Sequence, residues 1–151
     1  MPMYFEDFEV GRVFDLGSRT LSKESIVAFA HEFDAQPFHL DEEAAKTTIF
    51  GGLIASGWHT GSTLMGLLAT GLLNDTSSQG SPGIDELRWI KPVYPGATLR
   101  GYTTVLALKP SKSKPHLGLV QMLSELRDED DEAVLSFRNW GIFKCRDETA
   151  S

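Results

Sequence analysis

The strongest constraint on the fold is an apolar segment that covers residues 57–73. Its apolar side chains recur around almost the whole circumference of a helix, which is typical of a helix buried on all sides. Gly61, Gly66 and Gly71 interrupt the segment, and each lowers helix propensity by about 1 kcal/mol relative to alanine. We therefore expect a long central helix, beginning at Ser56 or Gly57, that a neighbouring element approaches closely enough to offset this cost. The apolar positions are Trp58, Leu64, Met65, Leu67, Leu68, Leu72 and Leu73.

Downstream of this helix the sequence takes on the pattern of strands. Residues 74–83 are rich in Gly, Ser and Asn, which predicts a loop. The later segments have strand composition and are separated by tight turns, which favours an antiparallel meander. The expected strands are 86–91, 98–108, 117–127 and 133–144, and a short strand over 12–19 precedes the helices.

Upstream of the central helix the sequence predicts two further helices. Ser22 is a good N-cap, and apolar residues follow it at helical spacing as far as Phe33. This helix should end near Asp34, because Pro37 disfavours helical backbone at the residue before it. Residues 41–46 form a short second helix capped by Asp41.

Helices followed by a run of strands indicate the α+β class. The simplest architecture is a single domain over residues 1–151, in which the long central helix is wrapped by one curved antiparallel sheet. The length suffices for one buried core. Large aromatic side chains are expected to be buried anchors of that core, namely Trp58, Trp89 and Trp140.

Charge and cysteine content limit the classes of partner and compartment. The net charge of −7 argues against nucleic acid as a partner, since phosphate binding needs a basic surface. The chain contains one cysteine, Cys145, so no intrachain disulfide can form and a reducing compartment fits best. The N-terminus lacks the pattern of a signal peptide, and no apolar run reaches membrane-spanning length. We therefore expect a cytoplasmic protein with no membrane contact.

One short segment carries a pair of groups suited to acid–base chemistry. Asp34 and His39 lie five residues apart across Pro37, between two predicted helices. Together they can hold one water molecule, take its proton and return a proton to the product. The neighbouring Phe33 and Phe38 should bring the pKa values of both groups toward neutrality by desolvation. Alternatively, Asp34 is a turn residue and His39 only satisfies a backbone carbonyl.

The residues that lead into the central helix contain a second candidate feature. Gly51 and Gly52 break the chain, and Ser56-Gly57 opens the helix. A helix N-terminus presents free N–H groups, and a ligand carbonyl can approach Gly57 closely because it has no side chain. Such an N–H would stabilise an oxyanion that develops on a thioester during addition at its β-carbon. The alternative is a plain glycine-rich helix start with Ser56 as its N-cap.

The two segments together resemble the MaoC-like (R)-specific enoyl-CoA hydratases. That family shows Asp, any residue, Asn, Pro, any residue, His, then a glycine-containing turn into the central helix. Asp34, Pro37 and His39 match this pattern, whereas Gln36 stands in place of the usual Asn and Ser56 in place of a frequent His. The later segment 87–96 also resembles the family's strand-and-turn signature.

The resemblance implies a hot-dog fold, in which a curved antiparallel sheet wraps around the long central helix. It implies a lyase of fatty acid metabolism, acting on acyl-CoA or acyl-carrier-protein thioesters at the interface of a homodimer or higher oligomer. Asp34 and His39 would be catalytic, and substrate contacts would come from Gly57, Ser56, Pro37 and Phe38. No metal or other cofactor is implied.

Two alternative functions remain open at this point. A hot-dog thioesterase generally has a carboxylate on its central helix, and residues 57–73 contain neither Asp nor Glu. A non-catalytic subunit that binds acyl thioesters would not require the Asp34 and His39 pair. The acyl chain, and the choice between CoA and a carrier protein, cannot be read from the sequence.

Overall fold

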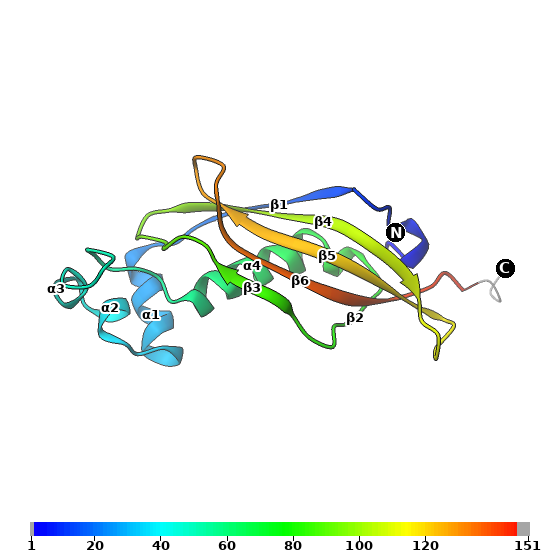
Figure 1. Ribbon diagram of the computed structural model, residues 1–151, viewed down its shortest axis with the longest axis horizontal. Helices are drawn as coiled ribbons and strands as arrows, with labels where there is room; N and C mark the ends of the chain where they lie inside the picture. Colours follow the sequence, from blue (N-terminus) through cyan, green and yellow to red (C-terminus); the bar gives the residue numbers. More distant parts are fainter. Residues whose placement is uncertain (1, 148–151) are drawn as a thin grey trace.

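The computed structural model describes residues 2–147, and a long helix lying against a curved sheet dominates it (Figure 1). The helices are α1 (Lys23–Phe33), α2 (Pro37–Leu40), α3 (Glu42–Ala45) and α4 (Gly57–Gly71), with 3₁₀ turns at Phe5–Asp7 and Leu73–Asp75. The strands are β1 (Val13–Thr20), β2 (Ser78–Gly80), β3 (Asp85–Trp89), β4 (Thr98–Pro110), β5 (Leu117–Arg127) and β6 (Ala133–Lys144). This arrangement is the α+β hot-dog architecture that the sequence predicted.

The sheet is antiparallel throughout and is built around three long strands. Its order is β1-β4-β5-β6-β2, and β3 also pairs with β6. Strands β4, β5 and β6 form the predicted meander, and their burial alternates along each strand. One face of the sheet is therefore covered, and α4 covers it (Figure 1).

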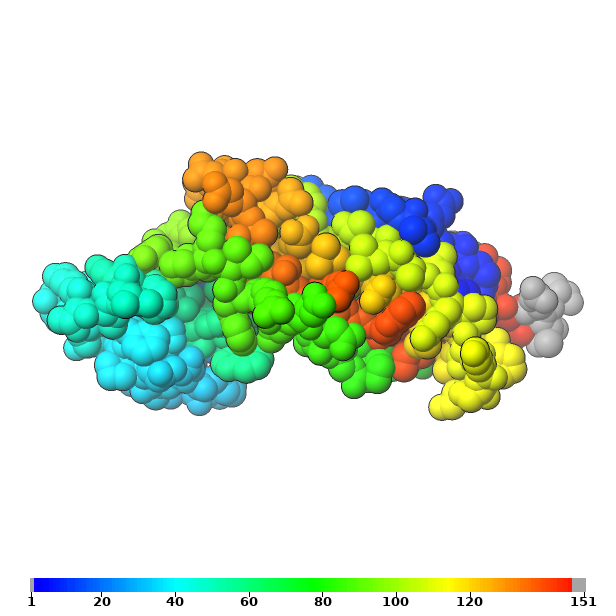
Figure 2. Space-filling view, in the orientation of Figure 1, coloured from blue at the N-terminus to red at the C-terminus, as the bar shows by residue number. Residues whose placement is uncertain are grey.

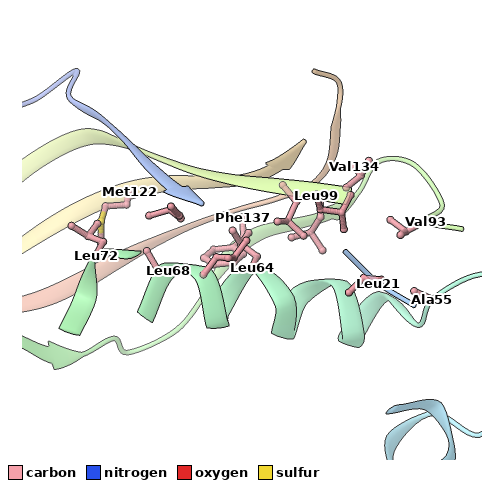
Figure 3. Close-up of a cluster of buried hydrophobic side chains, with 14 of the residues drawn as sticks. Leu21, Ala55, Leu64, Leu68, Leu72, Val93, Leu99, Met122, Val134 and Phe137 are labelled. Atoms are coloured by element: carbon pink, nitrogen blue, oxygen red, sulfur yellow. The ribbon is translucent and has the colours of Figure 1, made fainter. Parts of the chain in front are cut away.

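The core lies between α4 and this covered face. Leu64 and Leu68 of α4, and Leu72 directly after it, lie toward side chains of the sheet that include Phe137 and Met122 (Figure 3). The predicted close approach to a glycine occurs at Gly71, where an added Cβ would lie 2.8 Å from the carbonyl oxygen of Leu16 on β1. Leu16 lies at a register shift between β1 and β4, so an irregularity in β1 accompanies this contact.

The three short helices gather at one end of the molecule, and the turn between β4 and β5 lies at the other end (Figures 1 and 2). Ser22 caps α1 by accepting a hydrogen bond from the Ser25 N–H, and Asp41 caps α3, both as predicted. The N-terminal end of α4 lies at the same end of the molecule as α1, α2 and α3 (Figure 1). The segment that runs from Asp34, at the end of α1, to His39 in α2 is held against the start of the central helix by hydrogen bonds to Ser56 and Ile54.

Several details differ from the sequence predictions. Residues 37–40 form the short helix α2 with Pro37 at its first position, where the missing proline N–H costs nothing. The predicted loop 74–83 contains a 3₁₀ turn and the short strand β2. The expected burial of two tryptophans is wrong, because Trp58 is 58% exposed and Trp89 is 47% exposed. Within residues 2–147, no helix is both long and apolar enough to cross a membrane.

Candidate active site

A cavity of about 450 Å³ lies at the first turn of α4. Asp34 and His39 line it from the α1–α2 side, and Gly57 and Thr60 line it from α4. Its remaining wall is mostly apolar, with Phe38, Phe50, Ile54, Trp58, Trp89 and Val93 among the lining residues. Polar groups that converge in an otherwise apolar hollow are typical of a small-molecule site.

His39 is buried and held in one orientation. Its side chain is 5% exposed, and Nδ1 lies 2.8 Å from the carbonyl oxygen of Ile54. Because a carbonyl can only accept, Nδ1 carries the hydrogen and donates it. In the neutral ring Nε2 is then an acceptor, 3.3 Å from Oδ2 of Asp34. One water molecule has two hydrogens, so it can donate to both of these atoms.

Asp34 follows the last residue of α1 and is held by two further hydrogen bonds. Ser56 Oγ donates to its Oδ2 at 2.7 Å, and Gln36 Nε2 donates to its Oδ1 at 2.6 Å. The bond from Ser56, with smaller contributions from Gln36 and His39, holds the pKa of Asp34 below its ordinary value. The predicted rise of this pKa by desolvation is therefore wrong, since Phe33 is 64% exposed and the hydrogen bonds outweigh burial.

Ser56 connects the carboxylate to the central helix. Its hydroxyl accepts a hydrogen bond from the Trp58 N–H as the N-cap of α4, while it donates to Asp34. Its side chain is fully buried and holds Asp34 in place, and the direct contact of Ser56 with a substrate stays a prediction. Gln36, which replaces the usual Asn of the family motif, also donates a hydrogen bond to Asp34. The two positions that depart from that motif, Gln36 and Ser56, are thus the residues that hold the carboxylate.

We expect Ser56→Ala to raise the pKa of Asp34, because the change removes the largest interaction that favours the carboxylate. Proton uptake by Asp34, followed by carboxyl carbon NMR, should move to higher pH. Ser25→Ala is the matched control, since the Ser25 hydroxyl donates to the Ser22 carbonyl and not to Asp34. Equal titration of Asp34 in wild type and Ser56→Ala would contradict this assignment.

The same change alters how stability depends on pH. Because the folded-state pKa of Asp34 is lowered, its ionisation stabilises the folded chain above its unfolded-state pKa. That contribution is lost as the pH falls through the folded-state pKa. Ser56→Ala should therefore show a smaller loss of stability over this acidic range, in addition to a loss of about 1 kcal/mol at every pH from the missing N-cap.

Gly57 is the first residue of α4 and lines the cavity. Within residues 2–147 its N–H has no hydrogen-bond acceptor, as is usual for the first residue of a helix. An added Cβ would overlap the indole of Trp89, lying 2.5 Å from Cε2 and closer still to Nε1. Glycine is thus the residue that allows both Trp89 and a ligand to approach this N–H.

The other predicted substrate contacts lie in different places. Phe38 lines the cavity and packs against the His39 ring at 4.3 Å between centroids. Pro37 is exposed and is not part of the cavity wall, so its position suits starting α2 instead of touching a substrate. Sequence reasoning did not place Trp58, Thr60 or Trp89 at the cavity, and the motif 87–96 was the one available sign for Trp89.

Residues 2–147 contain no group of three or more His, Cys, Asp or Glu side chains placed to hold a metal ion. The cavity supplies instead a carboxylate, an imidazole and a free backbone N–H on apolar walls. Such a set can move a proton and stabilise a developing negative charge.

Comparison with known proteins identifies the family. The family model described as the MaoC like domain matches residues 7–124. The structure resembles the crystal structure of a MaoC-like dehydratase from Rhodospirillum rubrum, with a TM-score of 0.90 and 42% identity over 96% of this chain and 99% of that chain.

Two curated relatives extend this match. An uncharacterized protein of Bacillus subtilis, YdeM, is 36% identical over 133 residues, covering 87% of this chain and 92% of its own length. The (R)-specific enoyl-CoA hydratase of Rhodospirillum rubrum is 32% identical over 111 residues, covering 72% of this chain and 74% of its own length. Since the family model spans most of the chain and includes both Asp34 and His39, this protein belongs to the MaoC-like family.

Proposed function

We propose that this protein adds water reversibly across the double bond of a trans-2-enoyl thioester, with a CoA ester as substrate. One observation carries the proposal: the carboxylate of Asp34 and Nε2 of His39 lie 3.3 Å apart in the wall of a cavity that Gly57 also lines. The (R)-specific enoyl-CoA hydratase among its relatives supports this reaction class.

In this mechanism Asp34 and His39 bind the water through its two hydrogens. The water oxygen forms a bond to the β-carbon, and the pair takes up the proton that the water loses. The electrons of the double bond move toward the thioester carbonyl, whose oxygen becomes negative and accepts a hydrogen bond from Gly57. The pair then returns a proton to the α-carbon, so the atoms of one water molecule are added in total. The groups named here supply every proton transfer.

The test is the loss of enoyl-thioester absorbance when purified protein meets a panel of trans-2-enoyl-CoA esters of different chain length. Hydration of at least one ester supports the proposal and reports the chain-length preference. Release of free thiol from saturated acyl-CoA without hydration would indicate a thioesterase instead. Tight binding with neither reaction would indicate a non-catalytic acyl-thioester-binding subunit.

We also propose that the protein acts as a homodimer. Several large apolar side chains are exposed along one side of α4 and on or beside β3, and grouped exposed apolar side chains are typical of a protein–protein interface. Trp58 contacts Trp89, and Met65 and Ile84 share the wall of a second hollow, so these side chains lie close together. The exposed side chains are Trp58, Met65, Ile84, Trp89 and Ile90.

We therefore expect a mass of about twice 16.7 kDa, or a larger even multiple, by light scattering at micromolar concentration. Covering this apolar surface with a second copy is the physical reason. A monomeric mass at that concentration would remove the proposal of an interface beside the cavity.

A further inference from the structure

Trp89 occupies an unexpected position for a large aromatic residue at the end of a strand. Its pyrrole ring covers the Cα of Gly57. A Cβ added to Gly57 would lie 2.5 Å from Cε2 and 2.8 Å from Cδ1 of Trp89, and closer still to Nε1. Both residues line the cavity that contains Asp34 and His39. The ring therefore lies beside the free N–H of Gly57.

The indole N–H and the Gly57 N–H are close enough to serve one acceptor. A Cβ atom lies about 2.5 Å from its own backbone nitrogen, so Nε1 lies within about 5 Å of the Gly57 nitrogen. A single oxygen can accept from two N–H donors at about 2.9 Å each when the donors are less than about 5.8 Å apart. Among residues 2–147, neither of these donors has an acceptor of its own.

The surrounding structure holds Trp89 in place. Its backbone pairs with Leu135 of β6, and the following residue, Ile90, donates to the Val134 carbonyl at 2.8 Å. Its ring packs edge-to-face against Trp58 with 5.2 Å between centroids. A donor fixed in this way needs little reorganisation when charge develops, which is the condition for efficient stabilisation of an oxyanion.

We propose that the indole N–H of Trp89 is a second hydrogen-bond donor to the thioester oxygen, acting beside the Gly57 N–H. This inference rests on the proposed hydration of an enoyl thioester. Trp89 keeps its proton throughout: it accepts no electrons and forms no covalent bond, and its N–H only stabilises the negative charge that the thioester oxygen gains when water adds to the β-carbon.

The test compares Trp89→Phe with Trp140→Phe. Phenylalanine keeps an aromatic ring over Gly57 but has no N–H, so we expect kcat and kcat/KM to fall together by about 10²-fold, as for loss of one oxyanion donor. The pH dependence should keep its shape, because Trp89 transfers no proton. Trp140 packs beneath Lys109, away from the cavity wall, and its replacement should change kcat by less than about threefold.

A spectroscopic measurement separates hydrogen bonding from packing. Hydrogen bonds to the carbonyl polarise the conjugated system of trans-cinnamoyl-CoA, so its absorption band should shift to the red on binding. Both proteins in this comparison carry Asp34→Asn, because that change prevents consumption of the probe. We expect a smaller shift in Asp34→Asn/Trp89→Phe than in Asp34→Asn alone. Trp89→3-benzothienylalanine keeps the bicyclic shape and lacks the N–H, and it should reproduce the kinetic loss even where Trp89→Phe folds poorly.

The outcomes distinguish this inference from the function on which it rests. If wild type hydrates enoyl-CoA and the benzothienyl variant does so at the same rate, the role of Trp89 is overturned and the proposed function stands. An unchanged absorption shift in Asp34→Asn/Trp89→Phe also overturns it. If wild type itself hydrates no ester, the proposed function fails first, and the inference fails with it.

Discussion

Replacing Asp34 with asparagine is expected to lower kcat for enoyl-thioester hydration by about 10³-fold, within the range for loss of a general acid–base group. The amide has nearly the shape of the carboxylate but cannot take up the proton of the attacking water. Its oxygen can still accept from Ser56, and the exposed Gln36 can turn its own amide to suit the new partner. The fold should therefore be kept while the chemistry is lost.

The measurement is the initial rate of absorbance loss, with thermal unfolding of the same samples as the check on folding. Asp41→Asn is a matched control, because the Asp41 carboxylate likewise accepts a hydrogen bond, from the Glu43 N–H as the N-cap of α3, but lies outside the cavity wall. Its rate should stay within about twofold of wild type. Wild-type turnover in Asp34→Asn would rule out the proposed mechanism.

Gly71→Ala is expected to destabilise the folded protein by about 2 kcal/mol or more. The new Cβ would lie 2.8 Å from the carbonyl oxygen and 2.9 Å from the Cα of Leu16, both backbone atoms of β1. Backbone in a paired strand cannot move aside as a side chain can, so α4 and β1 would have to separate. The midpoint of urea unfolding, at an unchanged slope, measures this cost.

Gly61→Ala supplies the opposite case on the same helix. An added Cβ there meets no atom of residues 2–147 within 4 Å, so the change should stabilise the chain by up to about 1 kcal/mol through helix propensity. The two alanine variants should therefore differ in sign. A destabilisation of similar size in both would mean that the glycines matter for helix flexibility and not for the approach of β1.

The regular elements were predictable because their signals are local. Strands β5 and β6 begin and end at the predicted residues, since turn-forming residues bound them and their apolar residues alternate. The N-caps Ser22 and Asp41 followed from short-range hydrogen bonding in the same way. The Asp34 and His39 pair was singled out by its resemblance to the family motif, because the local pattern alone left a turn residue and a carbonyl-bonded histidine as the alternative.

Features that depend on distant residues were not predictable from these patterns. The bond from Ser56 to Asp34 joins residues 22 positions apart, and it reversed the expected direction of the Asp34 pKa shift. Hydrophobicity alone placed Trp58 and Trp89 in the core, whereas the fold leaves both half-exposed beside the cavity. Burial of a large aromatic residue is decided by which element covers it, and no local pattern encodes that.

The pairing of β1 with β4 has a consequence for the order of folding. Thr20 and Thr98, which lie opposite each other, are separated by 78 positions, and Asp34, His39, Gly57 and Trp89 all lie between them. Closing a loop of that length costs about 4 kcal/mol of chain entropy, which only the later strand contacts offset. Long-range pairing of this kind forms slowly. Trp89 and Ile90, in the wall of the hollow, are held by pairing with β6, so we expect the complete hollow to form late and a nascent chain to acquire it only after β6 has been synthesised.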